Sequence, residues 1–452
     1  CPSMRILGIF LSSKNITGGN GMLKITFMGA GSTIFAKNVI GDSLLTPALR
    51  DAEFALYDID HERLKESEMM LNNINKNYGK HGIINAYTDR KKALENADYI
   101  INAIQVGGYR PATVIDFEIP KKYGLRQTIG DTIGIGGIFR ALRTIPVMLD
   151  FAKDIEEVAS DALFLNYTNP MSILTGAMLE ATNVDIVGLC HSVQTCLSSL
   201  LEPLGMSTKN VKHQIAGINH MAWLLEVSRD GQDLYPEIKK RAFNRETPHD
   251  DLVRYEIMKR FGYYVTESSE HNAEYLPYFI KSNYPELIDK FNIPLDEYPR
   301  RCEEQIEEWK EMKDSLIDNE DLEHERSNEY ASYIMEAIET DSPYRIGGNV
   351  KNDNLIENLP NNAIVEVPCL VDRNGITPCH IGEIPEQLAA LNRTNINVHI
   401  MTIKAALEKK KEYIYQAALL DPHTSSELSI DDTINLCDDL IEAHGDWLPE
   451  YK

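Results

Sequence analysis

The fold of this chain is decided by Ile25-Thr-Phe-Met-Gly-Ala-Gly-Ser32, an apolar run that ends in closely spaced glycines. The run predicts a strand over 23–28 and a helix over 32–43. Glycines between a strand and a helix let backbone N–H groups approach a pyrophosphate at the helix N-terminus. Ile34 stands where the usual third glycine would be, so the motif alone also fits a plain strand–helix turn.

Downstream of this motif, predicted strands and helices alternate. The strands lie at 54–57, 99–104, 162–165 and 185–189, and the helices at 61–75, 140–155 and 171–181. This alternation predicts an α/β fold with a Rossmann-like, doubly wound parallel sheet over residues 22–210.

The pattern changes after about residue 211. Strands are predicted at 223–227 and 364–368, the latter followed by a turn at 372–375, and long charged helices at 303–316 and 399–419. Residues 211–452 are therefore expected to form a mixed α/β, helix-rich domain that carries substrate-binding, catalytic and oligomerisation surfaces.

The composition is typical of a soluble globular protein. The 452 residues are 43% hydrophobic and carry a net charge of −24, which argues against nucleic-acid or anionic-membrane partners. The apolar runs fall short of the roughly 18 residues that span a membrane. Seven cysteines without a CxxC pair indicate reduced thiols and a cytoplasmic protein. Residues 1–21 read as a leader or added segment outside the fold, with a natural start at Met22.

Polar residues at strand ends suggest a cofactor site. Asp58 ends the second predicted strand, where its carboxylate can bind ribose hydroxyls and would repel a 2′-phosphate, so NAD is preferred over NADP. We expect Gly29, Gly31 and Ser32 to bind this cofactor together with Asp58. A tight turn with an ordinary helix cap is the alternative.

Two further loops are candidates to line the same site. Asn166 and the Asn169-Pro170 turn follow the strand at 162–165, and ligands of open α/β sheets lie beyond such carboxyl ends. Asn-Pro is also a common turn without a ligand. Gln105 opens one glycine-rich turn and Arg140 follows another, and both turns are placed to close over cofactor and substrate.

Cys190 and His191 come directly after the strand at 185–189, and His220 lies at the edge of another predicted strand. Cys190 and His220 would give a metal one thiolate and one imidazole ligand, with positions left open for substrate oxygens. The alternative for each residue alone is a buried or surface side chain without a ligand. The segment Thr266-Glu-Ser-Ser-Glu-His271 is dense in proton-carrying groups and is either a source of a base or an exposed loop.

Taken together, these residues resemble glycoside hydrolase family 4, the NAD- and metal-dependent glycosidases. The similarity runs from about Met22 to Trp447 and includes Gly29-Ala-Gly-Ser32, Asn169-Pro170, Cys190-His-Ser192 and Gly217-Ile-Asn-His220. The form Cys190-His-Ser-Val-Gln194 resembles the α-galactosidase (melibiase) branch, whose substrates are unphosphorylated.

The resemblance implies a reaction unlike hydrolysis by paired carboxylates. A hydride passes from C3 of the sugar to NAD+, the C2 proton becomes acidic, and a metal stabilises the resulting charge. Loss of the C2 proton expels the aglycone, water adds, and the hydride returns. NAD+ is therefore restored in each turnover.

The resemblance also implies roles for individual residues. Cys190 and His220 match metal ligands, with Mn2+ the expected metal, and His191 matches the acid that protonates the leaving group. Asn169, and with it Arg140, is expected to bind substrate, while Gln105 and Asn166 join the cofactor site. Several family members use a tyrosine as the C2 base; here Glu270 falls closest to that position and Tyr264 is the second candidate.

Alternatives remain open at this stage. Within the family, α-glucosidase or α-galacturonidase activity fits as well. A lactate/malate-type 2-hydroxy-acid dehydrogenase fits the strand order and the Asn-Pro turn, although it has no use for a Cys–His metal pair. A non-catalytic NAD-binding protein is the third possibility. The resemblance also implies a homodimer or homotetramer.

Overall fold

The first half of the chain folds as a parallel sheet covered by helices on both faces. The computed structural model describes residues 21–244, 249–317 and 319–452; the expected leader at 1–21 lies almost entirely outside them. The six strands are β1 (Lys24–Met28), β2 (Glu53–Tyr57), β3 (Ile83–Tyr87), β4 (Tyr99–Asn102), β5 (Leu163–Asn166) and β6 (Asp185–Leu189). Their order, β3-β2-β1-β4-β5-β6, confirms the predicted doubly wound sheet.

Helices connect these strands. They are α1 (Thr33–Leu45), α2 (His61–Asn77), α3 (Arg90–Leu94), α4 (Val114–Lys122), α5 (Gly134–Val158), α6 (Met171–Ala181) and, after β6, α7 (Ser192–Leu201). The strands β1, β4 and β5 are buried on both faces, as in other sheets of this kind.

The second half adds antiparallel strands to the same sheet. They are β7 (Lys212–Ile218), β8 (Met221–Arg229), β9 (Gln232–Asp233), β10 (Tyr344–Lys351), β11 (Ile364–Asp372) and β12 (Gly375–Pro378). β10 bonds to β6, so among the described residues one sheet of twelve strands crosses the boundary expected near residue 210. The division into two domains stays a prediction.

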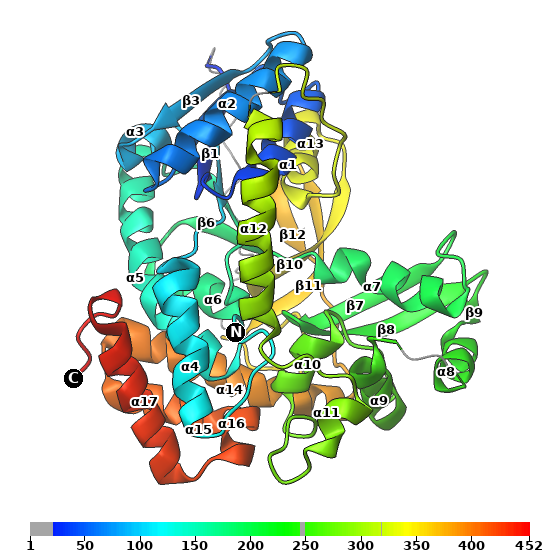
Figure 1. Ribbon diagram of the computed structural model, residues 1–452. Coiled ribbons are helices and arrows are strands. Elements are labelled where there is room, and N and C mark those ends of the chain that lie inside the picture. The colour runs from blue at the N-terminus through cyan, green and yellow to red at the C-terminus, as the bar shows by residue number, and fades with distance from the viewer. Residues whose placement is uncertain (1–20, 245–248, 318) are drawn as a thin grey trace, which may run out of the picture.

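The second half also contributes helices, most of which lie below the parallel sheet in Figure 1. They are α8 (Tyr235–Phe243), α9 (Leu252–Phe261), α10 (Ser269–Tyr275), α11 (Glu286–Lys290), α12 (Glu297–Ile317), α13 (Tyr330–Thr340), α14 (Glu386–Glu408), α15 (Lys411–Leu420), α16 (Pro422–Glu427) and α17 (Ile430–His444). The β7–β8–β9 hairpin and α8 project to one side, and α14–α17 form a layer below the sheet. In the part of the chain that is described, none of the helices has the length and apolar character of a membrane span.

Two predicted elements differ from the structure, and one strand was not predicted. The single helix expected at 399–419 is two helices, because Lys409 adopts φ +54°, a left-handed conformation that ends α14. α5 begins at Gly134 instead of Arg140, so its first turns contain Gly136 and Gly137. These glycines are needed for close packing on the preceding loop, because a Cβ would lie 2.4 Å from a backbone atom at Gly136 and 2.6 Å from one at Gly137. The strand β3 was not predicted, since its mixed burial gives no apolar run.

A buried histidine on α14 makes stability depend on pH. Burial lowers the pKa of His399 to about 4 from an ordinary value near 6.5. Between these two pH values the unfolded chain takes up a proton at His399, whereas the folded chain does not. The contribution of neutral His399 to the free energy of unfolding is therefore fully present above pH 6.5 and is lost as the pH falls toward 4. When the pH is lowered from about 7.5 to about 5.5, the free energy of unfolding of the parent protein is expected to fall by about 1 kcal/mol more than that of His399→Gln. Urea titration at the two pH values measures both changes.

The matched control is His380→Gln, because the His380 side chain is 58% exposed. This variant should keep the pH dependence of the parent protein. The same pH dependence in His399→Gln as in the parent would contradict the assignment.

Candidate active site

The loop between β1 and α1 is shaped by glycines. Gly29 has φ +89°, and a Cβ there would lie 2.7 Å from the carbonyl oxygen of Ala103. The amide of Gly31 donates to Asp58 Oδ2 at 2.7 Å, and a Cβ on Gly31 would meet this same carboxylate at 2.8 Å. The loop after β1 and the end of β2 are thus held together without side chains between them.

The start of α1 is open toward solvent and suits an anion. Ser32 makes no side-chain cap to the helix, and the first turn of α1 carries no acidic residue. Uncapped backbone N–H groups at a helix N-terminus favour phosphate oxygens. Asp58, in turn, is half-buried and is not the cap of α2, a role taken by Asp60. These residues therefore fit a dinucleotide.

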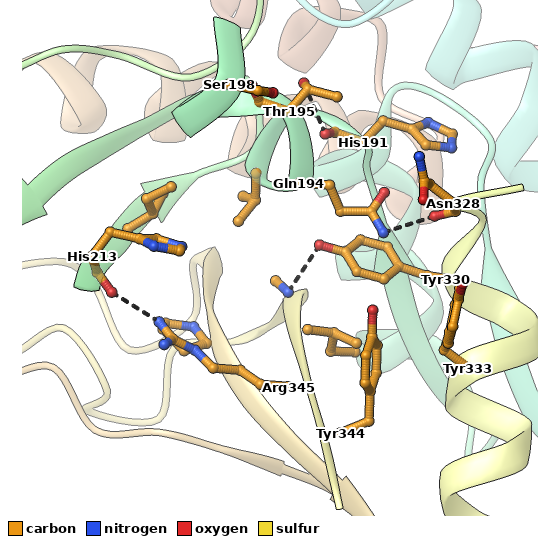
Figure 2. A pocket seen from close by; sticks show the side chains of 15 residues that line it. His191, Gln194, Thr195, Ser198, His213, Asn328, Tyr330, Tyr333, Tyr344 and Arg345 are labelled. Carbon is orange, nitrogen blue, oxygen red and sulfur yellow. Dashed lines mark hydrogen bonds between the residues drawn. The ribbon is translucent and has the colours of Figure 1, made fainter. Parts of the chain in front are cut away.

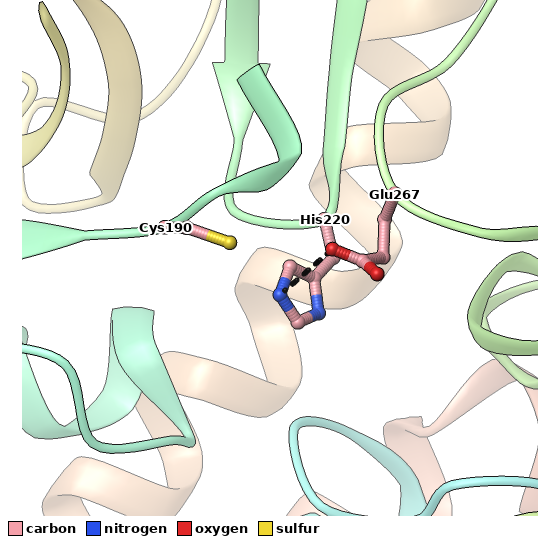
Figure 3. A group of neighbouring side chains, drawn as sticks. All are labelled: Cys190, His220 and Glu267. Carbon is pink, nitrogen blue, oxygen red and sulfur yellow. Dashed lines mark ion pairs between the residues drawn. The ribbon is translucent and has the colours of Figure 1, made fainter. Parts of the chain in front are cut away.

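Cys190, His220 and Glu267 converge at the ends of three different segments (Figure 3). Cys190 follows β6, His220 lies in the turn between β7 and β8, and Glu267 precedes α10. Their Sγ, imidazole nitrogen and carboxylate oxygen atoms all lie within 4.8 Å of one another. The structure brings together the two predicted ligands and adds Glu267.

The backbone of this group is held in an uncommon conformation. His220 has φ +61° and Glu267 has φ +67°. Both values lie in the left-handed region of the backbone, which residues other than glycine and asparagine seldom adopt. Such conformations persist where surrounding structure fixes them, and they cluster at functional sites. The conformation places His220 Nε2 3.4 Å from Glu267 Oε2.

The donor set fits a divalent transition metal. Burial, with the carboxylates of Glu366 and Glu267, raises the pKa of the Cys190 thiol well above its usual range. A bound cation reverses this preference and deprotonates the thiol. His220 Nδ1 is bonded to the Tyr275 hydroxyl at 2.8 Å, which leaves Nε2 for the metal. Three protein ligands leave positions open for substrate oxygens.

Polar side chains surround this group on the side of α5 and α10. Asp131 Oδ2 accepts from Asn169 Nδ2 at 3.2 Å, and Asp131 Oδ1 lies 3.7 Å from His271 Nε2. Arg140 donates to the Asn169 carbonyl and to the Tyr298 hydroxyl. Among the described residues Asn169 Oδ1 is buried without a hydrogen-bond partner, so it has an acceptor available for a sugar hydroxyl.

His191, the residue after Cys190, meets a carboxylate. Its Nε2 lies 2.6 Å from Glu329 Oε2. The hydrogen bond and charge of Glu329 raise the pKa of His191 above its ordinary value. The imidazolium is thereby favoured, which is the form that a proton donor needs.

The remaining predicted site residues have other surroundings. Gln105 is exposed and lies in the loop after β4, where it bonds weakly to Thr113. Asn166 is fully buried, and its amide is bonded to Asn102 and Thr168. Asn166 therefore supports the Thr168–Pro170 turn from within, and direct cofactor contact by its side chain stays a prediction.

Neither residue expected to be the base is bonded to the metal group. Tyr264 is fully buried in a separate core formed by α7, β8 and α9, and its hydroxyl donates to Asp251 at 2.6 Å. This burial does not favour Tyr264 as the base, and its role stays a prediction. Glu270 pairs with Arg301 at 2.5 Å and stays a prediction.

Residues 24–206 match the sequence model of the family 4 glycosyl hydrolases, and residues 215–424 match that of their C-terminal domain. The chain belongs to glycoside hydrolase family 4. The resemblance seen in the sequence is thereby confirmed.

Relatives of this family 4 hydrolase match most of its length. It is 67% identical over 432 residues to an α-galactosidase of Bacillus subtilis (strain 168), a match that covers 95% of this chain and 100% of the relative. The crystal structure of LplD from Bacillus subtilis superposes with a TM-score of 0.84 at 26% identity, covering 93% of this chain and 99% of that one.

A more distant structure shares the fold. A 6-phospho-α-glucosidase from gut microorganisms, solved in complex with NAD and Mn2+, has a TM-score of 0.78 at 22% identity, with 96% and 100% of the two chains covered. At this identity the likeness supports the fold of the family 4 hydrolase and not its substrate.

Sequence reasoning missed Glu267 and Tyr275 as members of the site. Both lie in or beside the segment 266–271, which its density of proton-carrying groups had already singled out. Spacing along the chain does not separate Glu267 from Glu270, because only the turn before α10 decides which carboxylate faces His220. The positive φ of Glu267 is visible in the structure alone.

Tyr275→Phe is expected to weaken Mn2+ binding by about 10- to 100-fold, because His220 Nδ1 loses the partner that orients its ring. Isothermal titration with Mn2+ measures the change. Tyr278→Phe is the control, since Tyr278 is nearly half exposed on the chain just after α10. Unaltered Mn2+ affinity in Tyr275→Phe would argue against His220 as a ligand.

Proposed function

We propose that this family 4 hydrolase is an NAD+- and Mn2+-dependent α-galactosidase that acts on unphosphorylated α-galactosides such as melibiose. One observation carries the proposal: the same chain contains the Cys190–His220–Glu267 group, which can hold a metal, and the glycine loop between β1 and α1, which can hold a dinucleotide. The 67% identity to a Bacillus subtilis α-galactosidase supports the choice of sugar.

The residues of the glycine loop would hold the dinucleotide. Gly29, Gly31 and Ser32 leave the N-terminus of α1 accessible to the pyrophosphate, and Asp58 supplies a carboxylate for ribose hydroxyls. When bound, NAD+ supplies a reversible hydride acceptor and Mn2+ a Lewis acid for sugar oxygens. Cys190, His220 and Glu267 would hold the metal.

Other side chains would place the sugar and move protons. Asn169 presents an unpartnered acceptor, and Arg140 fixes the Asn169 carbonyl. His191, whose pKa is raised by Glu329, would protonate the leaving oxygen. For the base that removes the C2 proton, Tyr275 joins Glu270 as a candidate, because its hydroxyl is bonded to the metal-ligand candidate His220.

The alternatives gain less support. A hydroxy-acid dehydrogenase does not account for the Cys190–His220–Glu267 group, nor for the family match over both halves of the chain. Action on α-glucosides or α-galacturonides is less consistent with the 67% identical relative. A homodimer or homotetramer and a cytoplasmic location complete the proposal; they rest on the family resemblance and on the sparse cysteines.

A panel of nitrophenyl glycosides tests the proposal. The α-galactoside should be hydrolysed with NAD+, Mn2+ and a thiol reductant, in preference to the α-glucoside, the α-galacturonide and 6-phosphorylated sugars. The reductant keeps Cys190 able to bind metal. Full activity on the α-galactoside in NAD-free, chelated enzyme would refute the cofactor requirement, and preference for another glycoside would refute the choice of sugar.

A further inference from the structure

A buried carboxylate to which the proposed function gives no role lies beside the Cys190–His220–Glu267 group. Glu366 is on β11 and is 1% exposed. Its Oε1 accepts a hydrogen bond from Asn349 Nδ2 on β10 at 3.1 Å. Its Oε2 is buried and has no hydrogen-bond partner of normal geometry among the described residues. A buried carboxylate in this state is costly unless a cation lies close to it.

Strand pairing places Glu366 between the two strands that lead to the metal-ligand candidates. It belongs to a row of paired residues that crosses the sheet in the order Gly188 (β6), Asn349 (β10), Glu366 (β11) and Gly217 (β7). β6 continues from this row to Cys190, and β7 continues to the turn that holds His220. Asn349 Nδ2 also donates to the Gly188 carbonyl at 3.3 Å. Asn349 therefore connects Glu366 to the strand that ends at Cys190.

The charge of Glu366 acts on the members of the Cys190–His220–Glu267 group. Burial raises the pKa of the Cys190 thiol, and the Glu366 carboxylate adds to this shift. Burial likewise raises the pKa of Glu366 to about 7, while the charge of His220 opposes the shift and that of Glu267 adds to it. Charges that affect one another in this way are poorly screened, so a further carboxylate strongly favours a divalent cation there.

The Glu366 carboxylate is closed off from the cavity that borders the same part of the sheet. This cavity measures about 580 Å3 and is lined on β10 by residues that include Arg345 and Gly347 (Figure 2). Asn349, further along β10, and Glu366 are not among the lining residues, and both are fully buried. Glu366 is therefore not placed to bind a ligand in the cavity, and its charge is directed at the Cys190–His220–Glu267 group.

We propose that Glu366 is a positioning residue of the metal site, which strengthens Mn2+ binding through its charge without being a ligand. This inference rests on the proposed Mn2+-dependent function. The three ligand atoms that lie within 4.8 Å of one another come from Cys190, His220 and Glu267, so Glu366 acts from behind them. Loss of a group that supports metal ligands in this way typically weakens metal binding by about 10- to 100-fold.

Isothermal titration of the metal-free protein with Mn2+ alone tests the inference at about pH 8, where most of the Glu366 carboxyl is charged. Glu366→Gln is expected to raise the Kd about 10- to 100-fold. Glu366→Asp keeps the charge and should bind Mn2+ at least about fivefold more tightly than Glu366→Gln. A role of shape alone gives the opposite order, because glutamine has the shape of glutamate. Asn349→Ala removes the bond that holds the carboxylate and should also weaken Mn2+ binding.

Thermal unfolding of the metal-free proteins separates this role from a structural one. Glu366→Gln should unfold at or above the temperature of the parent, because a buried charge with an unpartnered oxygen is removed. The matched control is Glu427→Gln, since the Glu427 side chain is 6% exposed and is paired with Lys281 at 2.9 Å. This control should unfold at a lower temperature than the parent and keep the parent Kd for Mn2+.

Three results would overturn the inference. They are a Kd of Glu366→Gln within about twofold of the parent, tighter Mn2+ binding by Glu366→Gln than by Glu366→Asp, and a metal-free Glu366→Gln protein that unfolds well below the parent. If the parent itself does not bind Mn2+, the proposed metal site fails and the inference fails with it. If Glu366→Gln does not fold, Asn349→Ala decides, and parent Mn2+ affinity in that variant would overturn the inference.

Discussion

Replacing Cys190 with serine is expected to lower kcat/KM for an α-galactoside by about 10³-fold, the loss expected when a group that stabilises developing charge is removed. Cys190 would supply the soft ligand of the group that it forms with His220 and Glu267. A serine hydroxyl has a far higher pKa than a thiol and would not give an anionic ligand. The purified variant should also lose Mn2+, measured by elemental analysis and isothermal titration.

A matched variant separates the ligand from a general need for thiols. Cys379 is exposed, so Cys379→Ser should keep both activity and metal content. Thermal unfolding shows whether Cys190→Ser is folded. A folded Cys190→Ser enzyme with full Mn2+ content and parent kinetics would remove Cys190 from the metal site.

Removal of NAD+ is expected to lower the rate of α-galactoside hydrolysis by at least about 10³-fold, because a group that takes part in the chemical steps is lost. Activity should return on addition of NAD+ but not of NADP+, because the Asp58 carboxylate bonded to Gly31 would repel a 2′-phosphate. Product formed in D2O should carry deuterium at C2, since the proposed route removes and restores that proton.

A variant of the glycine loop tests the same step without stripping the enzyme. A methyl group on Gly31 would lie 2.8 Å from Asp58 Oδ2, so Gly31→Ala should displace the carboxylate and weaken NAD+ binding. Gly231→Ala is a control at a turn with open space around the glycine, although its positive φ makes some loss of stability expected. Hydrolysis with no deuterium at C2 would exclude the elimination route.

The doubly wound parallel sheet can be predicted from the sequence because it depends on local signals. Apolar runs, turn residues and the glycine loop each leave a mark within a few residues, and right-handed crossovers restrict how such units assemble. The predicted strand at 185–189 coincides with β6, and the helix at 171–181 coincides with α6. β3 escaped prediction because its burial is mixed, and α5 was placed too late because its glycines serve close packing.

The sequence by itself determined the family, the dinucleotide-type loop around Gly29, and Cys190 with His220 as the metal-ligand candidates. Only the tertiary structure decided which acidic and phenolic groups join them. Glu267, and not Glu270, meets His220, and Tyr264 is enclosed in a separate core. The physical reason is that these residues come together through the β7–β8 turn and the turn before α10, whose left-handed residues orient the side chains in a way that sequence spacing does not encode.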